Sequence, residues 1–541
     1  MVGLDEPQRR WEFPSGTRKE RDMKLMAGGP MTWAAQRFAE RIAIVCEGEG
    51  QSLTFHELNA DVNRLAHALR AFGLQPGDRV AILQPNCHRF ILALFGVQKA
   101  GLVPVCLNTR YAAREHAIIL NDCSARALLV AGECVETIAP VRGALSTVEH
   151  YLCTDGDADG MLNMTAVMAA QPTCEPGIEV EADALARLWY TSGTTGRPKG
   201  AMITHAIQSE HLKLFLMNME VAIGPDDAML HVGPMTHASG NYILPHVVRG
   251  ARNVILPRFD PARVLETVVR QRITMLHLVP TMLFRLLEVA EQGTFDVSSV
   301  KRINYGAAPM PVSVLRRAIQ VFGPVFRQHY GLTEAVQPVT LLLPEEHVLE
   351  GDETAMRRLA SAGRPALGVE VRVVDDQGRD VKPGEMGEIV VRGPHVMQGY
   401  WNLPEATAET LRDGWLHTKD MATIDEDGFI YIVDRKDDLI ISGGFNIYPR
   451  EVEEALYGHP AVREAVVFGV PDEEWGEAVM ALVALNDGQA VTADALIAHC
   501  RQHLASYKKP RFVRFVPELP KSAVGKVLRR ELKAQYRSSV P

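Results

Sequence analysis

The sequence is poor in cysteine, and its cysteines form no paired motif. Its 541 residues include only eight cysteines, which are scattered singly without a C-x-x-C pair. This spacing provides neither a disulfide framework nor a structural zinc site, and it suits a reducing compartment. We therefore expect a cytoplasmic protein.

Long apolar runs and an excess of positive charge are also missing. No stretch approaches the roughly 18 apolar residues that a membrane-spanning helix needs. Residues 1–30 are polar and of mixed charge, without the apolar core of a secretory signal. The formal net charge of −9 argues against nucleic acid as the main partner. These absences favour a globular protein without a transmembrane segment. The chain is long enough for more than one domain.

The first part of the chain alternates between helical and strand-like patterns. Thr54 and Glu57 are spaced as a capping box, apolar residues then recur at helical intervals, and Gly73 follows as a helix stop. Short buried strands are predicted at 79–83 and 127–130. This alternation predicts an α/β fold with several layers and mainly parallel sheets.

The pattern changes in the last third of the chain. Residues 369–374 and 388–392 alternate in polarity and are separated by glycine-containing turns, which indicates a small antiparallel β unit at about 345–434. The residues beyond it carry strand and helix signals of their own. We therefore predict a large N-terminal domain, 1–434, and a small C-terminal α/β domain, 435–541.

The most informative segment runs from Tyr190 to Gly200 and reads YTSGTTGRPKG. Its glycines let backbone N–H groups converge without obstruction, while its hydroxyls and Lys199 supply further donors and a positive charge. A polyphosphate requires this combination. The segment does not fit the G-x-x-x-x-G-K-S/T pattern of a Walker A loop. A glycine- and threonine-rich surface turn is the alternative interpretation.

The segment resembles the phosphate loop of the adenylate-forming superfamily, which includes acyl-CoA synthetases, peptide-synthetase adenylation domains and beetle luciferases. A single motif would be weak support, but further motifs of that superfamily occur in the expected order along nearly the whole chain. These motifs lie at 53–58, 99–108, 306–309, 330–334, 414–420, 434–451 and 520–526.

The resemblance implies an AMP-forming acid–thiol ligase that activates a carboxylate with ATP and passes the acyl group to coenzyme A. A glycine–alanine turn and a tyrosine ring would frame the adenine. Glu334 and Thr191 would hold Mg²⁺, which prefers oxygen ligands, and Asp420 would accept the ribose hydroxyls. The implied nucleotide-binding residues are Thr191, Ser192, Gly193, Thr194, Thr195, Gly196, Gly306, Ala307, Ala308, Pro309, Tyr330, Gly331, Thr333, Glu334, Asp420 and Arg435.

One position departs from the superfamily pattern. The residue before Asp420 is usually glycine, and here it is Lys419. The substitution leaves the aspartate in place. Its effect on the loop is an open question at the level of sequence.

The resemblance assigns the chemistry of adenylation to Lys526, with Lys199 in the phosphate loop. The attacking carboxylate and the α-phosphate are both negative, and a lysine between them offsets their repulsion. Lys526 lies in a basic segment, for which a solvated helix is the alternative interpretation.

For the second half-reaction, Asp437 resembles the hinge about which the C-terminal domain rotates. Gly443 and Gly444 resemble the wall of a tunnel in which absent side chains leave room for pantetheine. Trp475, Lys509 and Arg511 fall in segments that contact coenzyme A in related ligases, and an indole face and two cations suit an adenine and a phosphate.

The predicted acyl pocket is small and uncharged. An amino-acid-activating enzyme would need an acidic side chain to pair with the substrate ammonium, and none occurs between Met229 and Arg249. This favours an apolar monocarboxylate, either a fatty acid or an aryl acid. The residues predicted to line the pocket are His237, Ala238, Ser239, Ala307, Val336 and Gln337. His237 is also predicted to be a catalytic residue.

Three alternatives are weighed against this interpretation: loading of a carrier-protein phosphopantetheine, a luciferase-like oxygenase, and nucleotide binding without turnover. The chain ends soon after Lys526, so we expect no fused carrier domain, and its last residues lack a Ser-Lys-Leu address. The intact set of Lys199, Glu334 and Lys526 argues against the third. The expected partners are a small carboxylate, ATP and coenzyme A, with a homodimer left open.

Overall fold

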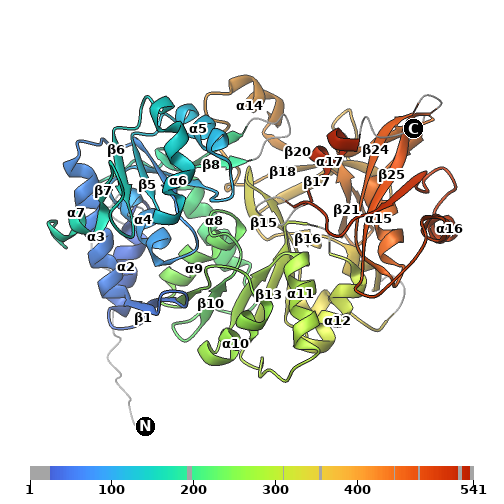
Figure 1. The fold of residues 1–541 in the computed structure, drawn as a ribbon, viewed down its shortest axis with the longest axis horizontal. Helices are drawn as coiled ribbons and strands as arrows, with labels where there is room; N and C mark the ends of the chain where they lie inside the picture. Colours follow the sequence, from blue (N-terminus) through green and yellow to red (C-terminus); the bar gives the residue numbers. More distant parts are fainter. Residues whose placement is uncertain are drawn as a thin grey trace, which may run out of the picture.

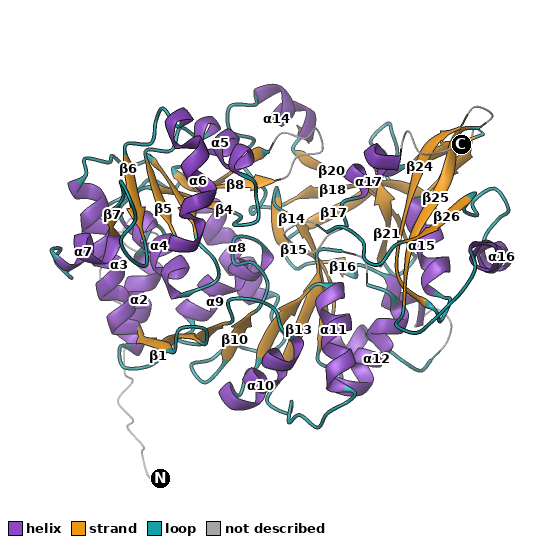
Figure 2. Cartoon of the chain, in the orientation of Figure 1, coloured by secondary structure: helices purple, strands orange, loops and turns teal. Residues whose placement is uncertain are grey.

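The computed structural model describes residues 25–191, 198–308, 310–351, 356–443, 445–472, 475–521 and 527–536. Four β-sheets and the helices around them run from the N-terminal to the C-terminal side of the molecule (Figures 1 and 2). Among the described residues, no helix combines the length and the apolar character that crossing a membrane would take.

A seven-stranded sheet forms the N-terminal side. All of its neighbouring strands are parallel except the last pair, β8 and β9, which form an antiparallel hairpin. Its strands, in spatial order, are β7 (Leu162–Asn163), β6 (His150–Cys153), β5 (Ala127–Val130), β3 (Arg79–Leu83), β4 (Val103–Leu107), β8 (Leu185–Thr191) and β9 (Lys199–Thr204).

A nine-stranded sheet lies beside it. Its central strands are parallel, and antiparallel strands close both edges. The spatial order is β16 (Arg364–Pro365), β15 (Ala335–Leu342), β14 (Phe326–Leu332), β13 (Arg302–Gly306), β12 (Met275–Leu278), β10 (Ala228–His231), β11 (Arg252–Ile255), β1 (Ile42–Cys46) and β2 (Gln51–Thr54).

Amphipathic helices bury the apolar faces of these two sheets. The helix predicted after Thr54 is α3, and its capping box is confirmed: Glu57 N–H donates to the Thr54 hydroxyl, and the Glu57 carboxylate accepts from Thr54 N–H. The helices of this part are α2 (Gly29–Phe38), α3 (Phe55–Ala71), α4 (His88–Lys99), α5 (Ala113–Asp122), α6 (Val135–Ile138), α7 (Met164–Ala169), α8 (His205–Met217), α9 (Ile243–Val248), α10 (Pro261–Gln271), α11 (Pro280–Ala290) and α12 (Val312–Phe322).

A third, five-stranded sheet is antiparallel throughout, as the alternating pattern predicted. It connects the large sheets to the C-terminal part, and α14 (Pro404–Thr410) lies beside it (Figure 1). Its strands are β17 (Glu370–Val374), β18 (Met386–Arg392), β19 (Leu411–Arg412), β20 (Trp415–Ile424) and β21 (Ile430–Arg435).

The C-terminal part has its own sheet and its own apolar core, reached through the short 3-10 helix η6 (Lys436–Asp438). Figure 1 places it on the opposite side of the molecule from α2 and α3. The strands are β22 (Ile440–Ser442), β23 (Phe445–Ile447), β24 (Val462–Asp472), β25 (Gly476–Leu485) and β26 (Phe512–Phe515), and the helices are α15 (Pro449–Tyr457), α16 (Ala493–His503) and α17 (Arg529–Tyr536).

The predicted fold class is therefore confirmed, with mainly parallel large sheets and a small C-terminal α/β unit. The strands predicted at 79–83 and 127–130 coincide with β3 and β5. The boundary between 434 and 435 stays a prediction.

Candidate active site

A cavity of about 850 Å³ lies between the nine-stranded sheet and the C-terminal part. One wall is formed by residues at the ends of β13 and β14 together with β20 and β21, and the other by α15, β24 and the start of α17. The cavity brings together six of the predicted nucleotide-binding residues: Ala307, Ala308, Tyr330, Gly331, Asp420 and Arg435.

Three of these residues form a charge-assisted chain at the cavity. The Tyr330 hydroxyl donates to Asp420 Oδ2 at 2.6 Å, and Arg435 Nε lies 2.6 Å from Asp420 Oδ1. Asp420 and Arg435 are directly opposite each other in the β20–β21 ladder, so the sheet register sets their pairing. These linked contacts thereby hold a carboxylate, a cation and an aromatic face at one wall of the cavity.

The protonation states follow from this environment. Burial, followed by the neighbouring Asp420 charge, raises the pKa of Tyr330 well above its usual value, so its hydroxyl stays a donor. The Asp420 carboxylate raises the pKa of Arg435, which keeps the guanidinium charged. The arrangement therefore offers oxygen acceptors and one fixed cation to a ligand in the cavity.

The turn after β13 allows backbone to approach closely. A Cβ atom on Gly306 would lie 2.2 Å from the His329 carbonyl oxygen on β14, so only glycine fits there. Ala307 follows with φ of 66°, in the left-handed region that is strained for a residue with a side chain. Pro309 lies outside the described residues.

The predicted phosphate loop connects β8 and β9. Thr191 and Lys199 are opposite each other at the end of this hairpin, while Ser192, Gly193, Thr194, Thr195 and Gly196 lie outside the described residues. A Cβ atom on Gly200 would meet the Tyr190 ring at 2.9 Å, which explains the glycine that ends the motif.

Tyr400 was missed by the sequence analysis. Its hydroxyl donates to Glu334 Oε1 at 2.7 Å, and Lys199 Nζ lies 5.1 Å from the centroid of its ring. Its backbone pairs with Ala201 of β9. Tyr400 thus connects the predicted metal ligand to the predicted phosphate loop. The aromatic pair Tyr400–Trp401 after a glycine was the available signal.

The remaining residues of the 330–334 motif form the connection between β14 and β15. A Cβ atom on Gly331 would lie 2.8 Å from the Gln337 backbone nitrogen, so this turn also requires glycine. Thr333 and Glu334 occupy the tip of the turn, where both are partly exposed.

Lys419 adopts the conformation for which glycine is favoured. Its φ is 62°, in the left-handed region, and its backbone N–H donates to Glu388 Oε1 at 3.0 Å. Its ammonium group pairs with Glu409, 3.0 Å away. Lysine therefore keeps the loop conformation and leaves Asp420 in place, with a backbone that glycine would adopt without strain.

His237 lies directly before the 3-10 helix η3 (Ala238–Tyr242), which carries Ala238 and Ser239. The Asn108 side-chain amide is 3.1 Å from His237 Nε2. Ser239 is hydrogen-bonded to His231 at 2.9 Å, and burial lowers the pKa of His231 to about 4, which makes it neutral. Val336 is buried on β15 and is followed by Gln337, whose carbonyl oxygen lies 2.8 Å from His211 Nε2.

A half-buried cation near η3 was not expected. Arg187 stacks on Trp189, with its guanidinium carbon 3.9 Å from the ring centroid, and forms a long 3.4 Å hydrogen bond to Asn241 Oδ1. Burial lowers the pKa of Arg187 to about 10. The predicted lining remains uncharged, but a guanidinium group lies in its surroundings.

The predicted coenzyme A residues lie together in the C-terminal part. Gly443 has φ of 57°, and a Cβ atom on it would lie 2.3 Å from the Trp475 ring. Asp472 accepts from Trp475 N–H at 3.0 Å and pairs with Arg511 at 2.7 Å. Lys509 is half-buried two residues before Arg511, and Gly444 is outside the described residues.

Asp437 lies in η6, and its side chain is outside the described part of the chain. Lys526 also lies outside it. Val527, the first described residue after Lys526, lines the cavity and forms an isolated antiparallel bridge with Lys521.

Arg529 was also missed, because its segment reads as a basic helix. Its guanidinium group contacts Asp434 at 3.1 Å, Asp438 at 2.9 Å and Glu453 at 2.8 Å. Burial alone would lower the pKa of Arg529, but these carboxylates raise it above its usual value. Arg529 therefore joins β21, η6 and α15 around the predicted hinge.

Comparison with known proteins agrees with this geometry. A feruloyl-CoA synthase from Amycolatopsis sp is 41% identical over 489 residues, covering 90% of this chain and 94% of that protein. A long-chain-fatty-acid–CoA ligase from Bacillus subtilis is 37% identical over 533 residues, covering 93% of each. The structure of the amide bond synthetase McbA from Marinactinospora thermotolerans matches with a TM-score of 0.84 at 32% identity, covering 94% of this chain and 100% of that one.

The family described as AMP-binding enzyme matches residues 31–401, and the AMP-binding enzyme C-terminal domain matches residues 451–526. The first match alone spans more than half of the chain and contains the predicted phosphate loop. The chain therefore belongs to the AMP-binding enzyme family, in the acyl-CoA synthetase branch of the adenylate-forming superfamily.

Proposed function

We propose that this enzyme converts an apolar monocarboxylate and ATP to an acyl-adenylate and pyrophosphate, and then transfers the acyl group to coenzyme A. The observation that carries the proposal is the cavity in which Tyr330, Asp420 and Arg435 face a C-terminal wall that includes Val527. Val527 directly follows the proposed catalytic residue Lys526 in the sequence.

In the first half-reaction, a carboxylate oxygen attacks the α-phosphorus of ATP and pyrophosphate leaves. Asp420 would accept the ribose hydroxyls, and the Tyr330 ring would support the adenine. Lys199 would contact the phosphates, and Lys526 would lie between the carboxylate and the α-phosphate, where negative charge accumulates. These residues would position the reactants and stabilise charge without forming a covalent bond to them.

Thr191 and Glu334 would hold Mg²⁺. Their hydroxyl and carboxylate oxygens are ligands that Mg²⁺ prefers, and Tyr400 occupies only one of the two Glu334 oxygens with a hydrogen bond. The donor set therefore fits the ion. When bound, Mg²⁺ supplies charge neutralisation at the phosphate oxygens.

In the second half-reaction, the coenzyme A thiol attacks the acyl carbonyl, a C–S bond forms, and AMP leaves with the electrons of the broken acyl–oxygen bond. We propose that rotation at Asp437 replaces the Lys526 segment with the Gly443–Gly444 wall. Trp475, Lys509 and Arg511 would then bind the nucleotide end of coenzyme A, and the link from Trp475 through Asp472 to Arg511 supports a common site.

The acid is proposed to be a fatty acid or an aryl acid. The sequence between Met229 and Arg249, which contains His237 and Ser239, includes no acidic residue that could pair with a substrate ammonium group, which supports the exclusion of amino acids. The Arg187 guanidinium near Asn241 supports including aryl acids that carry a hydroxyl group. We place the enzyme in the cytoplasm, where reducing conditions suit its eight free cysteines.

Pyrophosphate release with a panel of acids tests the substrate class. Hexanoate to dodecanoate, benzoate and hydroxylated cinnamates should outperform every amino acid and malonate. Thioester formation should then be compared between coenzyme A and a phosphopantetheinylated carrier protein. Preference for an amino acid, or for the carrier protein, would contradict the proposal. Light scattering would establish whether the chain also forms a homodimer.

A further inference from the structure

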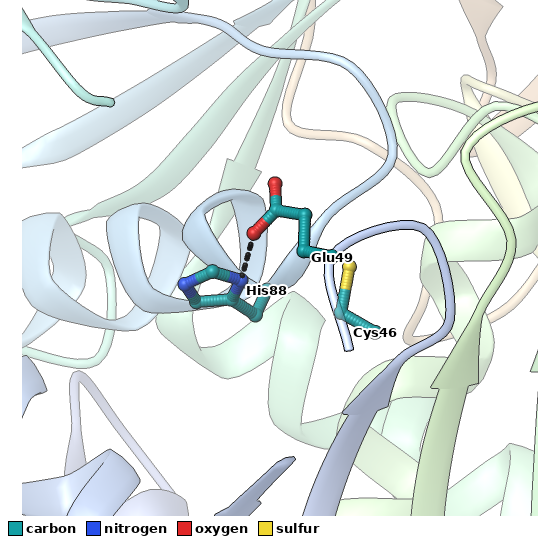
Figure 3. Close-up of side chains that lie close together, drawn as sticks. All are labelled: Cys46, Glu49 and His88. Atoms are coloured by element: carbon teal, nitrogen blue, oxygen red, sulfur yellow. Dashed lines mark ion pairs between the residues drawn. The ribbon is translucent and has the colours of Figure 1, made fainter. Parts of the chain in front are cut away.

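Three side chains with metal-binding atoms meet at one edge of the nine-stranded sheet (Figure 3). Cys46 ends β1, Glu49 lies in the turn between β1 and β2, and His88 begins α4. One ligand atom from each lies within 4.8 Å of the other two, and no other group of this kind occurs among the described residues. These residues belong to none of the predicted nucleotide, acyl or coenzyme A sets.

Hydrogen bonding within the protein leaves the His88 ring incompletely satisfied. Its Nδ1 atom is buried and forms no hydrogen bond in the described structure, but it makes an ion-pair contact of 3.1 Å with Glu49 Oε2 (Figure 3). Arg89 occupies the other carboxylate oxygen of Glu49 at 2.7 Å. A buried polar atom without a hydrogen bond is costly, and Oε2 faces it as an available acceptor or ligand.

The side-chain chemistry suits a metal site. The neutral imidazole ring of a histidine carries a nitrogen lone pair. Cys46 is a fully buried free thiol, and a thiol releases its proton when it binds a metal ion.

We propose that Cys46, Glu49 and His88 bind one Zn²⁺ ion. Sulfur, imidazole nitrogen and a carboxylate oxygen form a ligand set typical of zinc, whereas Mg²⁺ avoids thiolate. Metal–ligand bonds of about 2.0–2.3 Å in a tetrahedral arrangement separate the ligands by roughly 3.3–3.8 Å. The 3.1 Å between His88 and Glu49 is close to that value. The Cys46–Zn bond forms as the thiol proton passes to the solvent.

The ion would cross-link two elements that are distant in sequence. It joins the β1–β2 turn to the first turn of α4, which follows Asn86. Asn86 in turn holds the loop before His237: its amide donates to Gly233 O at 2.8 Å and accepts from Met235 N–H at 2.9 Å. Because the three ligands come together only in the folded chain, Zn²⁺ should stabilise the native state by mass action.

The experiment uses the full-length protein after treatment with a chelator. Zn²⁺ affinity is measured by competition with a chromophoric chelator, and Co²⁺ is added separately to detect a thiolate-to-metal absorption band. We expect one Zn²⁺ per chain, the thiolate band with Co²⁺, and a higher Tm with Zn²⁺. Cys46→Ser should abolish the band, and Glu49→Gln should weaken Zn²⁺ binding by roughly 10-fold or more.

Two matched variants serve as controls. Cys174→Ser removes an exposed thiol, and His503→Gln removes one ring of the adjacent histidine pair on α16, 4.6 Å from His499 between centroids. Both should bind Zn²⁺ as the wild type does. If Cys46→Ser does not fold, the Zn²⁺ affinity of Glu49→Gln tests the proposal instead, because Glu49 is partly exposed and its substitution should not prevent folding. Equal Zn²⁺ binding by wild type and Glu49→Gln, or a Co²⁺ complex without the thiolate band, would overturn the proposal.

Discussion

The two walls of the cavity are held by different forces. Tyr330, Asp420 and Arg435 are fixed by neighbouring strands, and the pairing of Asp420 with Arg435 follows the register of β20 and β21. The opposite wall is attached through Arg529, whose one guanidinium group contacts three carboxylates from three elements. A strand ladder keeps one geometry, whereas ion pairs can exchange partners when elements move.

This difference suits an enzyme that performs two reactions in one place. The wall that we assign to the nucleotide must keep its shape through both half-reactions. In the proposed mechanism, the wall that includes Val527 leaves after the first. We therefore expect substitutions on the fixed wall to affect nucleotide recognition, and substitutions on the other wall to separate the two half-reactions.

Lys526→Ala should have the largest effect. Losing one positioned charge at the phosphoryl transition state should slow adenylation by about 10²- to 10³-fold. Preformed acyl-adenylate with coenzyme A should give thioester at a near wild-type rate, because the proposed rotation withdraws Lys526 before this step. The half-reactions are followed by pyrophosphate release and by thioester formation, with the exposed neighbour Arg530→Ala as control. Equal loss in both steps would indicate a structural role.

Asp420→Asn should rank second. It removes the negative charge that Tyr330 and Arg435 contact at 2.6 Å. Because hydrogen bonds to charged groups are strong, we expect kcat/KM for ATP to fall by about 10- to 100-fold. KM for the acid should change little, because we assign Asp420 to the nucleotide and not to the acid. The control is Asp427→Asn, which changes an exposed carboxylate in the connection between β20 and β21. A fall in kcat/KM for the acid, with kcat/KM for ATP unchanged, would contradict the assignment.

Arg529→Gln should have a smaller and selective effect. It leaves Asp434 and Glu453 buried without their cation, which disfavours the present orientation of the C-terminal part. We expect adenylation to fall by roughly 10-fold, the scale of one lost charged hydrogen bond, and thioester formation from preformed adenylate to fall less. Circular dichroism checks folding. Unchanged adenylation would mean that this network does not hold the orientation.

Lys419→Gly should have the smallest effect. Relief of the left-handed backbone should stabilise the enzyme by at most about 1 kcal/mol, partly offset by the greater freedom of glycine in the unfolded chain. The expected result is a slightly higher Tm with unchanged KM for ATP. A marked change in KM would show that the lysine side chain itself acts on the nucleotide.

Local patterns predicted the elements better than they predicted contacts between distant segments. The capping box at Thr54 and the strands at 79–83 and 127–130 depend on neighbouring residues, and all three are confirmed. Tyr400 was missed because its role comes from contact with Glu334, 66 positions away. Neither residue carries a signal of the other in the sequence.

The same reason explains Arg529 and the zinc ligands. Arg529 looks like part of a solvated basic helix until Asp434, 95 positions away, is placed beside it. Cys46 and His88 lie far apart in the sequence, outside the short spacing of a sequence motif for zinc. Only the packing of α4 against the end of β1 brings them together.

The central claim is that one cavity serves two half-reactions by rotation at Asp437. Asp437 is the second residue of η6, a helical position where the fixed φ of proline is tolerated. Asp437→Pro should therefore hold the present orientation, with Val527 at the cavity. The decisive measurement compares acyl-adenylate formation with coenzyme A consumption in one preparation. We predict near wild-type adenylation and a loss of well over ~10-fold in thioester formation; survival of both steps would contradict rotation at this residue.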